Sequence, residues 1–484
     1  MSPSEFPIPL EFVQKNVLLP IEEQGKLKVG VCPETPREAL EDLRLLLNRD
    51  VEPVPLTRQE VDEGIRLLIT ETVGEASGED EDLLTLDEDT QDLLSLSKGA
   101  PIIRLVNSLF LRAINSHASD IHIEPYERES LVRLRIDGVL HEVLSIPASQ
   151  FAAVISRLKV MAKLNLAEHR LPQDGRIRVK AGEKLIDVRV SIVPTLFGER
   201  AVMRLLDRTV QLLTLASLGI SKENYARVRD LIGHSYGSVL VTGPTGSGKS
   251  TTLYAILQEV QSPNRNIITI EDPVEFQIKG IGQIQVNPKV GMKFADGLRS
   301  ILRQDPDVIM VGEIRDPETA EIATHASLTG HLVLSTLHTN DAPTAVSRLV
   351  DMGVESFLVS ASLLGIIAQR LVRKLCQKCR TPYHPREDEL LQLGLNGIKT
   401  SAVFYKPKGC PECMNTGFVG RIGVFEIMLI DDELRHLISM ASEASVLRAA
   451  ARKKGMKTLL EDAAQKVLDG LSCTEEVLRV TGGN

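Results

Sequence analysis

The stretch VLVTGPTGSGKSTTLYAIL, residues 239–257, decides the fold class of this 484-residue chain. An apolar run precedes the pattern G-x-x-x-x-G-K-S, and a helical run follows it. Glycines let backbone N–H groups approach phosphate oxygens, and the positive end of the following helix faces the same anion. Lys249 is expected to reach the β- and γ-phosphates, and the Ser250 hydroxyl is expected to bind Mg²⁺. The predicted nucleotide-binding loop comprises Gly243, Pro244, Thr245, Gly246, Ser247, Gly248, Lys249, Ser250 and Thr251.

The segments around this loop alternate strand and helix patterns, which is typical of a parallel sheet with connecting helices. Strand patterns occur in SVLVTG, NIITIED, DVIMVGE and HLVLSTLH. In such a sheet the ligand binds at the carboxyl ends of the strands. Glu313 directly follows the apolar run 308–311, whereas Asp307 precedes that run. We therefore predict that Glu313 is the carboxylate on the magnesium side.

Acidic and hydroxyl side chains follow two further strand patterns. Glu275 lies beyond a proline in the loop of IITIEDPVEF and is the candidate base that orients the attacking water, with Glu271 as the alternative. Asp272 in the same loop is as consistent with a structural role, in a turn or as a helix cap, as with a role at the phosphates. The strand pattern GHLVLSTLHTND ends in Thr336, His338 and Thr339, where a histidine or a hydroxyl can act on the γ-phosphate.

Four of the six cysteines form two C-x-x-C pairs with thirty residues between them. Two such pairs suit a tetrahedral Zn²⁺ bound by four thiolates, which is a closed structural site. A redox pair and unbound thiols are the competing interpretations, and a disulfide is disfavoured in a cytosolic chain. We predict a zinc-binding insert at residues 376–413 with the ligands Cys376, Cys379, Cys410 and Cys413.

The composition indicates a globular protein of more than one domain, with 43% hydrophobic residues and a net charge of −9. The negative charge disfavours nucleic acid as the main partner. The N-terminus lacks the basic and apolar regions of a signal peptide. The apolar run 357–372 is too short for a membrane span, so we interpret it as a buried helix and expect a cytoplasmic protein.

The pattern along the chain divides it into four segments. Residues 1–70 have the apolar spacing of a small α/β module, with helical patterns at 37–47 and 61–71. An acidic linker is expected at 71–96, because residues 71–92 hold ten acids and no base. A mixed α/β domain is expected at 97–213 and a RecA-like nucleotide-binding domain at 214–484.

Seven ordered motifs resemble the secretion ATPase family, which powers type II secretion, type IV pilus assembly and DNA uptake. They are ASDIHIEP, RLRIDGVL, LPQDGRI, GPTGSGKST, ITIEDPVEF, ILRQDPDVIMVGEIRD and TGHLVLSTLHTND, and the resemblance runs from about residue 97 to 484. It implies ATP hydrolysis with Mg²⁺. It also implies that arginines lie near the phosphates, where cations neutralise charge in the transition state. The matching positions are Arg189, Arg204 and Arg299, in DVRVS, AVMRLL and GLRSILRQDPD.

The resemblance also implies a hexameric ring and a partner at the membrane. The N-terminal module resembles that of type II secretion members, where it docks on the cytoplasmic part of an inner-membrane protein. The expected function is therefore ATP-driven pseudopilus assembly for type II secretion, with peripheral membrane association and without nucleic acid. Type IV pilus assembly is the alternative. A nucleotide-binding scaffold without hydrolysis and a DNA-handling motor are the rival classes.

Overall fold

The computed structural model describes residues 101–182, 184–207, 213–397 and 401–482, with residues 90–92 and parts of 16–61. It contains two compact units, Met1–Glu88 and Asp89–Asn484. None of the helices in the described part of the chain is long and apolar enough to cross a bilayer.

The first unit contains a three-stranded sheet of β1 (Leu18–Glu23), β2 (Lys26–Val31) and β3 (Glu52–Pro55). The first two strands are antiparallel, and the third runs parallel to β2. Strand side chains such as Leu18 and Val29 are fully buried, so the sheet has a buried apolar face. The helices expected at 37–47 and 61–71 fall almost entirely outside the described residues.

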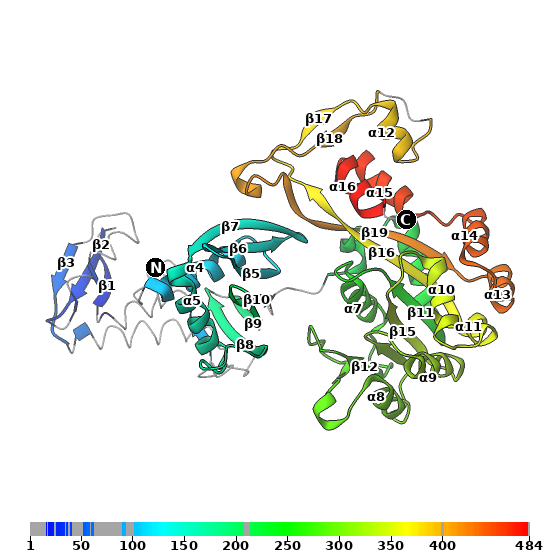
Figure 1. Cartoon of the computed structure of the whole chain (residues 1–484), viewed down its shortest axis with the longest axis horizontal. Coiled ribbons are helices and arrows are strands. Elements are labelled where there is room, and N and C mark those ends of the chain that lie inside the picture. Colours follow the sequence, from blue (N-terminus) through cyan, green and yellow to red (C-terminus); the bar gives the residue numbers. More distant parts are fainter. Residues whose placement is uncertain are drawn as a thin grey trace. The chain divides into compact units, whose positions relative to one another are not determined.

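The second unit begins with a seven-stranded sheet in the order β4-β8-β9-β10-β5-β6-β7. Strands β5 to β10 of this sheet are labelled in Figure 1. Helices α4 (Pro101–Asn115) and α5 (Ala148–Met161) pack on it through one apolar core, which includes Phe110, Leu158 and Val188. The strands are β4 (Thr90–Asp92), β5 (Asp120–Pro125), β6 (Glu129–Ile136), β7 (Val139–Pro147), β8 (Gln173–Ala181), β9 (Lys184–Thr195) and β10 (Gly198–Asp207). This arrangement confirms the expected mixed α/β domain.

Strand β4 falls inside the segment that composition assigns to a linker. Thr90–Asp92 pairs in parallel with Arg178 to Lys180 of β8, at the edge of the sheet. Pairing at an edge uses backbone hydrogen bonds, so an acidic strand is tolerated there. The last residues of the acidic stretch therefore belong to the sheet.

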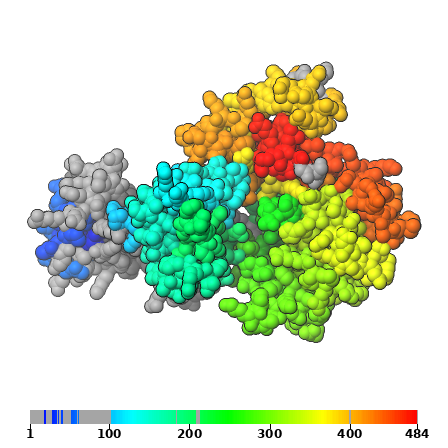
Figure 2. Space-filling model, viewed as in Figure 1, coloured from blue at the N-terminus to red at the C-terminus, as the bar shows by residue number. Residues whose placement is uncertain are grey.

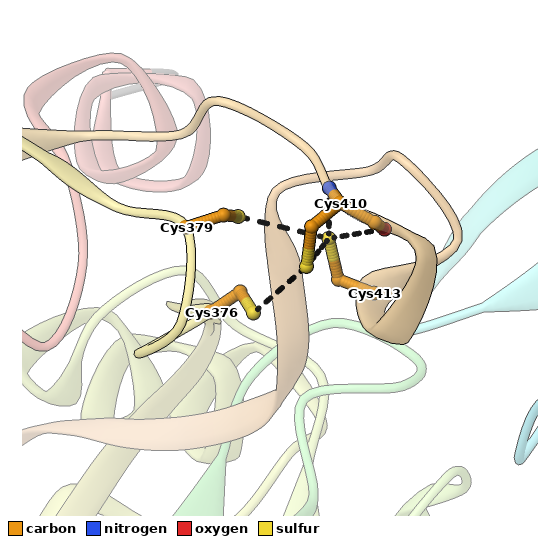
Figure 3. A group of neighbouring side chains, drawn as sticks. All are labelled: Cys376, Cys379, Cys410 and Cys413. Carbon is orange, nitrogen blue, oxygen red and sulfur yellow. Dashed lines mark hydrogen bonds between the residues drawn. The ribbon is translucent and has the colours of Figure 1, made fainter.

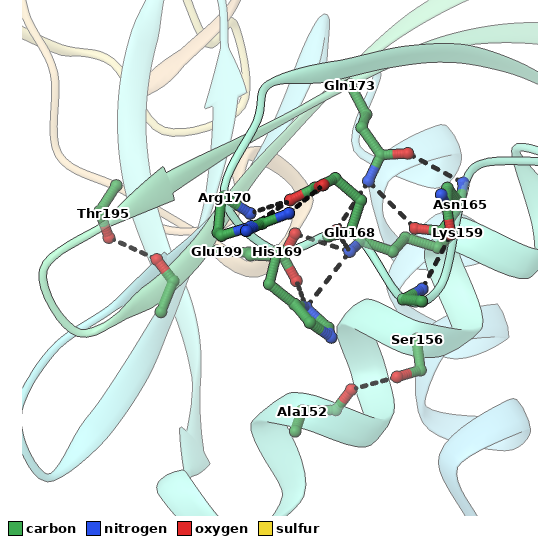
Figure 4. A network of polar contacts seen from close by, with 12 residues as sticks. Ala152, Ser156, Lys159, Asn165, Glu168, His169, Arg170, Gln173, Thr195 and Glu199 are labelled. Carbon is green, nitrogen blue, oxygen red and sulfur yellow. Dashed lines mark hydrogen bonds and ion pairs between the residues drawn. The ribbon is translucent and has the colours of Figure 1, made fainter.

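A buried polar network holds the loop between α5 and β8 (Figure 4). The Lys159 side chain is 1% exposed, and its Nζ lies 2.7 Å from Oε1 of Glu199 on β10. Lys159 Nζ and Gln173 Nε2 both donate to the backbone oxygen of Glu168, at 2.6 and 3.0 Å. A buried cation requires such partners. The network gives a structural reason for a glutamine in LPQDGRI.

The second domain of this unit is a seven-stranded sheet in the order β13-β12-β14-β15-β11-β16-β19. All neighbouring strands are parallel except β16 and β19, which are antiparallel. The strands are β11 (Gly237–Thr242), β12 (Ile267–Glu271), β13 (Gly282–Gln285), β14 (Val308–Val311), β15 (Leu332–Leu337), β16 (Leu363–Leu375) and β19 (Phe418–Leu429).

Helices cover both faces of this sheet (Figure 1). Within β11, Val239 and Val241 face the core that includes α6 (Lys222–Gly233) and α7 (Lys249–Val260), while Leu240 faces the opposite core. A strand buried on both faces is apolar throughout, as these sequences are. The other helices are α8 (Phe294–Ile301), α9 (Pro317–Leu328), α10 (Ala342–Asp351), α11 (Ser356–Ser362), α13 (Asp432–Ser439) and α14 (Ala444–Lys453).

The interpretation of residues 357–372 as one buried helix is wrong. Helix α11 ends at Ser362, and β16 begins at Leu363 and continues to Leu375. Strand β16 lies between β11 and β19, so most of its residues are buried. Hydrophobic periodicity cannot distinguish a strand buried on both faces from a buried helix, because both are apolar at every position.

An insert between β16 and β19 contains β17 (Thr381–Tyr383), α12 (Glu387–Gln392) and β18 (Phe404–Lys406). Its apolar residues Leu390 and Phe404 share a core with α15 (Leu459–Leu468) and α16 (Thr474–Thr481). In Figure 2 the yellow and orange insert lies against these helices, which are drawn in red. The insert is thus supported by the C-terminal helices as well as by its cysteines.

Candidate functional site

The phosphate loop connects β11 to α7, which begins at Lys249. Gly248 has a φ of 87°, in the left-handed region that glycine adopts at little cost. A Cβ at Gly248 would lie 2.8 Å from the side-chain Nε2 of Gln369, and a Cβ at Gly243 would lie 2.5 Å from the backbone oxygen of Gln369. Glycines are therefore required where the loop packs against β16.

Lys249 is buried beneath this loop, and its Nζ donates to the backbone oxygens of Gly243 at 2.8 Å and Pro244 at 3.2 Å. Burial lowers the pKa of Lys249 to about 8, with a further contribution from the nearby Arg370 cation. The Glu313 carboxylate acts in the opposite direction. An anion at the loop would relieve this burial penalty, because it favours the charged lysine.

Ser247 provides an independent sign that the loop receives a polar ligand. Its side chain is 4% exposed, and its hydroxyl has no hydrogen-bond partner within the described residues. A buried hydroxyl without a partner is costly. An acceptor such as a phosphate oxygen would satisfy it, so the loop fits the nucleotide that its sequence predicts.

The loop forms one wall of a cavity of about 430 Å³, a volume suited to a small ligand. The opposite wall consists of the carboxyl ends of β12, β14 and β15, as the parallel sheet requires. The residues that line the cavity include Thr245, Gly246, Ser247, Gly248, Lys249, Ser250, Thr251 and Tyr254 from the loop and α7, and Glu271, Asp272, Pro273, Glu275, Phe276, Glu313, Arg315, Thr336 and His338 from the strand ends.

Glu313 lies beside an arginine and a histidine at the end of β14. Its Oε2 lies 2.7 Å from Nε of Arg315 and 3.5 Å from Nε2 of His338, and its side chain is 14% exposed. Burial and the charge of Lys249 lower the pKa of His338, although Glu313 acts in the opposite direction. The neutral imidazole is therefore favoured near neutral pH.

Glu271 and Glu275 both line the cavity, but their surroundings differ. Glu271 is 4% exposed and accepts hydrogen bonds from Tyr254, Thr269 and Gln283. The Glu275 side chain is 34% exposed and pairs with Arg189, with 3.5 Å between Oε2 and Nη2. The carboxylate that is open to a water molecule is that of Glu275.

The hydroxyls at the end of β15 separate into two environments. Thr336 lines the cavity and donates to the Gly312 oxygen at 2.8 Å. The Thr339 hydroxyl lies 2.7 Å from that of Thr242 and donates to the Asp341 oxygen at 3.0 Å. Thr339 thus connects the strand ends and does not line the cavity.

The three candidate arginines are not brought together. Arg189 and Arg204 line a second cavity of about 530 Å³ in the middle domain, where Arg204 Nε lies 3.0 Å from Asp120 Oδ1. Arg299 lies on α8, and its Nη2 donates to Glu318 on α9 at 2.5 Å. It does not line the phosphate cavity.

The four paired cysteines converge, as Figure 3 shows. Their sulfur atoms all lie within 4.8 Å of one another, with separations of 3.9, 3.8 and 3.6 Å for the pairs 376–410, 379–413 and 410–413. Tetrahedral Zn²⁺ with Zn–S bonds of about 2.3 Å places its sulfurs roughly 3.8 Å apart. The three measured separations therefore fit a tetrahedral zinc site.

The backbone around Cys413 favours its thiolate. The N–H groups of Cys410 and Gly417 each donate to Cys413 Sγ at 3.2 Å. Burial raises the pKa of the Cys413 thiol, but these donors and the neighbouring cysteines outweigh it and hold the pKa at about 7. A thiolate is the form that binds the metal.

Sequence reasoning did not single out Arg315, Tyr254 or Gln283. Arg315 lies two residues beyond Glu313, so its position at a strand end was a usable signal. Tyr254 resembles an ordinary core residue of a helix, and Gln283 a polar residue of an edge strand. Only the fold brings them to the loop that carries Glu275.

The model of the family described as "Type II/IV secretion system protein" matches residues 95–479. The chain belongs to this secretion protein family. Type II secretion system protein E of Dickeya dadantii is 49% identical over 98% of this chain and 97% of its own length. Type II secretion system ATPase E of Vibrio cholerae is 53% identical over 81% of this chain and 77% of its own length.

Two solved structures show the same fold. The pilus retraction motor PilT is 27% identical, with a TM-score of 0.52 over 77% of this chain and 95% of its own. The Legionella pneumophila ATPase DotB is 21% identical, with a TM-score of 0.59 over 82% of this chain and all of its own. Together with the phosphate loop, these matches identify this secretion ATPase as an ATP-hydrolysing enzyme.

Proposed function

We propose that this secretion ATPase hydrolyses ATP to drive pseudopilus assembly and protein export in a type II secretion system. The observation that carries the proposal is identity of about half over nearly the whole chain to proteins named type II secretion system protein E. The phosphate loop and Glu313 supply the corresponding chemistry at one cavity.

In the proposed reaction, Lys249 and the loop N–H groups bind the phosphates, and Ser250 and Glu313 would hold Mg²⁺ and its water ligands. When bound, Mg²⁺ would neutralise negative charge on the phosphates in the transition state. Glu275 accepts a proton from the attacking water and orients it. His338, which lies 3.5 Å from Glu313, donates a hydrogen bond on the γ-phosphate side. We assign hydrolysis to these residues.

We propose that Arg189 and Arg204 neutralise charge in the transition state. Arg189 already contacts Glu275, which supports this assignment. Arg299 lines neither the phosphate cavity nor the cavity that contains Arg189 and Arg204, so we leave it outside the minimal set. For the four cysteines we propose a structural zinc, because a cluster of four thiolates leaves the metal no open position.

We further propose that six copies form a ring at the cytoplasmic face of the inner membrane. The N-terminal module would dock on the cytoplasmic domain of a membrane-platform protein. Large apolar side chains on the middle domain support self-association, since Leu171, Leu196 and Phe197 are 62%, 88% and 50% exposed. The net charge of −9 favours protein partners over nucleic acid.

Type IV pilus assembly is the second candidate function. The pilus assembly ATPase PilB of Myxococcus xanthus is 44% identical over 97% of this chain and 85% of its own length. We favour type II secretion because the relatives with that name reach higher identity over the same span.

Deletion of the gene separates the two functions. We expect loss of exoprotein release with surface pili retained, and loss of pili with normal release would contradict the proposal.

Complementation of the deletion with Lys249→Ala or Glu313→Gln should fail. The purified variants should release phosphate at least about 100-fold more slowly than the wild type, because phosphate binding or metal binding is lost. Equal rates would indicate a scaffold without hydrolysis.

A further inference from the structure

The loop between β12 and β13 carries Glu275, and its backbone must be held for that carboxylate to face the cavity. Asp272, Pro273, Glu275 and Phe276 line the phosphate cavity. Three polar side chains outside this loop hold it: Tyr254 on α7, Glu271 at the end of β12 and Gln283 on β13.

Tyr254 connects the loop to the helix that begins at the phosphate-binding lysine. Its ring is 2% exposed. The phenol donates to Oε2 of Glu271, and its oxygen accepts the backbone N–H of Glu275 at 3.2 Å. Burial and the hydrogen bond to Glu271 raise the pKa of Tyr254, so it keeps its proton. The Tyr254 hydroxyl thus donates to Glu271 and accepts from the loop backbone.

Glu271 is an anchor because its oxygen atoms are already engaged. Besides Tyr254, it accepts from the Thr269 hydroxyl at 2.6 Å and from Gln283 Nε2 at 3.0 Å, both on Oε1. A buried carboxylate needs such donors. If Glu271 gave up these hydrogen bonds to bind a water molecule, its buried charge would be poorly solvated. Glu271 is therefore better suited to holding the loop than to catalysis.

Gln283 holds the other side of the loop. Its Nε2 also donates to the backbone oxygen of Phe276 at 3.0 Å, and its Oε1 accepts the N–H of Ile278 at 2.7 Å. The backbone is therefore fixed at residue 275 by Tyr254 and at residues 276 and 278 by Gln283. The Glu275 side chain between these points remains partly exposed.

We propose that Tyr254 and Gln283 are positioning residues for ATP hydrolysis, which hold the 272–278 loop through Glu271 so that Glu275 faces the phosphate cavity. This inference rests on the proposed role of Glu275. It connects phosphate binding to water activation, because Tyr254 lies on the same helix as Lys249. Misplacement of a catalytic group by about 1 Å can cost roughly 100-fold in rate.

Tyr254→Phe in the full-length protein tests this proposal, because it removes the hydroxyl and keeps the ring. We expect kcat to fall about 10- to 100-fold while KM for ATP changes less than about threefold, since the phosphate loop is intact. Residues that act as a unit are not additive. The double variant Tyr254→Phe/Glu275→Gln should therefore be no more than about threefold slower than Glu275→Gln alone.

Two matched controls separate positioning from stability. Tyr225→Phe removes an exposed hydroxyl that donates to Glu259 at 3.0 Å, so its kcat should stay within about twofold of the wild type. Thr269→Val removes another buried donor to Glu271 that does not contact the loop. It should lower the melting temperature while kcat stays within about twofold. If Thr269→Val lowers kcat as much as Tyr254→Phe, the positioning role is wrong.

Further outcomes make the test decisive. If Tyr254→Phe does not fold, Gln283→Leu replaces it, and the same loss of kcat without a change in KM is expected. A folded Tyr254→Phe protein with wild-type kcat would overturn the proposal. So would a double variant Tyr254→Phe/Glu275→Gln whose loss of kcat equals the product of the two single losses. Wild-type turnover in Glu275→Gln alone would instead refute the role of Glu275.

Discussion

At the residue scale, the charge of Lys249 depends on the cavity around it. The side chain is buried beside a second cation, Arg370, and in the described structure it donates only to carbonyl oxygens of its own loop. Bound phosphates would replace these carbonyls with full negative charge. ATP binding and protonation of this lysine are therefore linked.

We predict that ATP binding weakens above pH 8 and takes up a proton. The pKa of Lys249 is about 8 in the free protein, so the lysine is charged below that pH and loses its proton above it. One pH unit above a pKa leaves roughly a tenth of a group protonated, so affinity at pH 9 should be about tenfold lower than at pH 7. Titration with a fluorescent ATP analogue at both pH values measures the change.

Lys249→Arg is the matched control, because a guanidinium keeps its charge throughout this range. Its affinity should be weaker but nearly independent of pH between 7 and 9. If the wild type binds ATP equally well at both pH values, the coupling is absent.

At the element scale, the cysteine insert contains two short strands and one short helix. Its apolar residues pack on α15 and α16, and its four sulfurs already have the separations of a tetrahedral site. Elements this short are marginal by themselves. A metal bound by Cys376, Cys379, Cys410 and Cys413 would close the base of the insert and support it.

We predict about one zinc per chain, lost in Cys413→Ser. Removing a structural metal removes its contribution to folding, so the melting temperature should fall by about 4 °C or more. Metal analysis and thermal unfolding measure both effects. Cys32→Ser, at a buried cysteine in the first unit, should keep the zinc. A Cys413→Ser protein with full zinc content would contradict the four-thiolate site.

At the scale of the whole molecule, the proposed catalytic residues come from two domains of the second unit. The phosphate loop and Glu313 lie on the β11–β19 sheet, whereas Arg189 and Arg204 lie on neighbouring strands of the middle sheet. Both arginines have acidic partners, Glu275 and Asp120, which they would have to leave on reaching the phosphates. Such an exchange would couple hydrolysis to domain movement.

We predict that Arg204→Gln lowers kcat by about 10³-fold or more with ATP affinity changed less than about threefold, because its charge acts on the transition state. Arg178→Gln is the control, since Arg178 lies on the same sheet and pairs with Asp187, 3.7 Å away, outside the arginine-lined cavity. Phosphate release and nucleotide titration measure the two quantities. Equal losses in both variants would show that the effect comes from the fold of the middle domain.

The amino-acid sequence was enough to predict the nucleotide loop, the parallel sheet, the carboxylate after β14 and the four paired cysteines. These features have local patterns: a glycine spacing, apolar runs and C-x-x-C pairs. Tertiary structure decided that residues 363–375 form a strand, because burial on both faces hides the period. It also separated Glu271 from Glu275, since the fold buries Glu271 among hydrogen bonds from Tyr254, Thr269 and Gln283 and leaves Glu275 partly exposed.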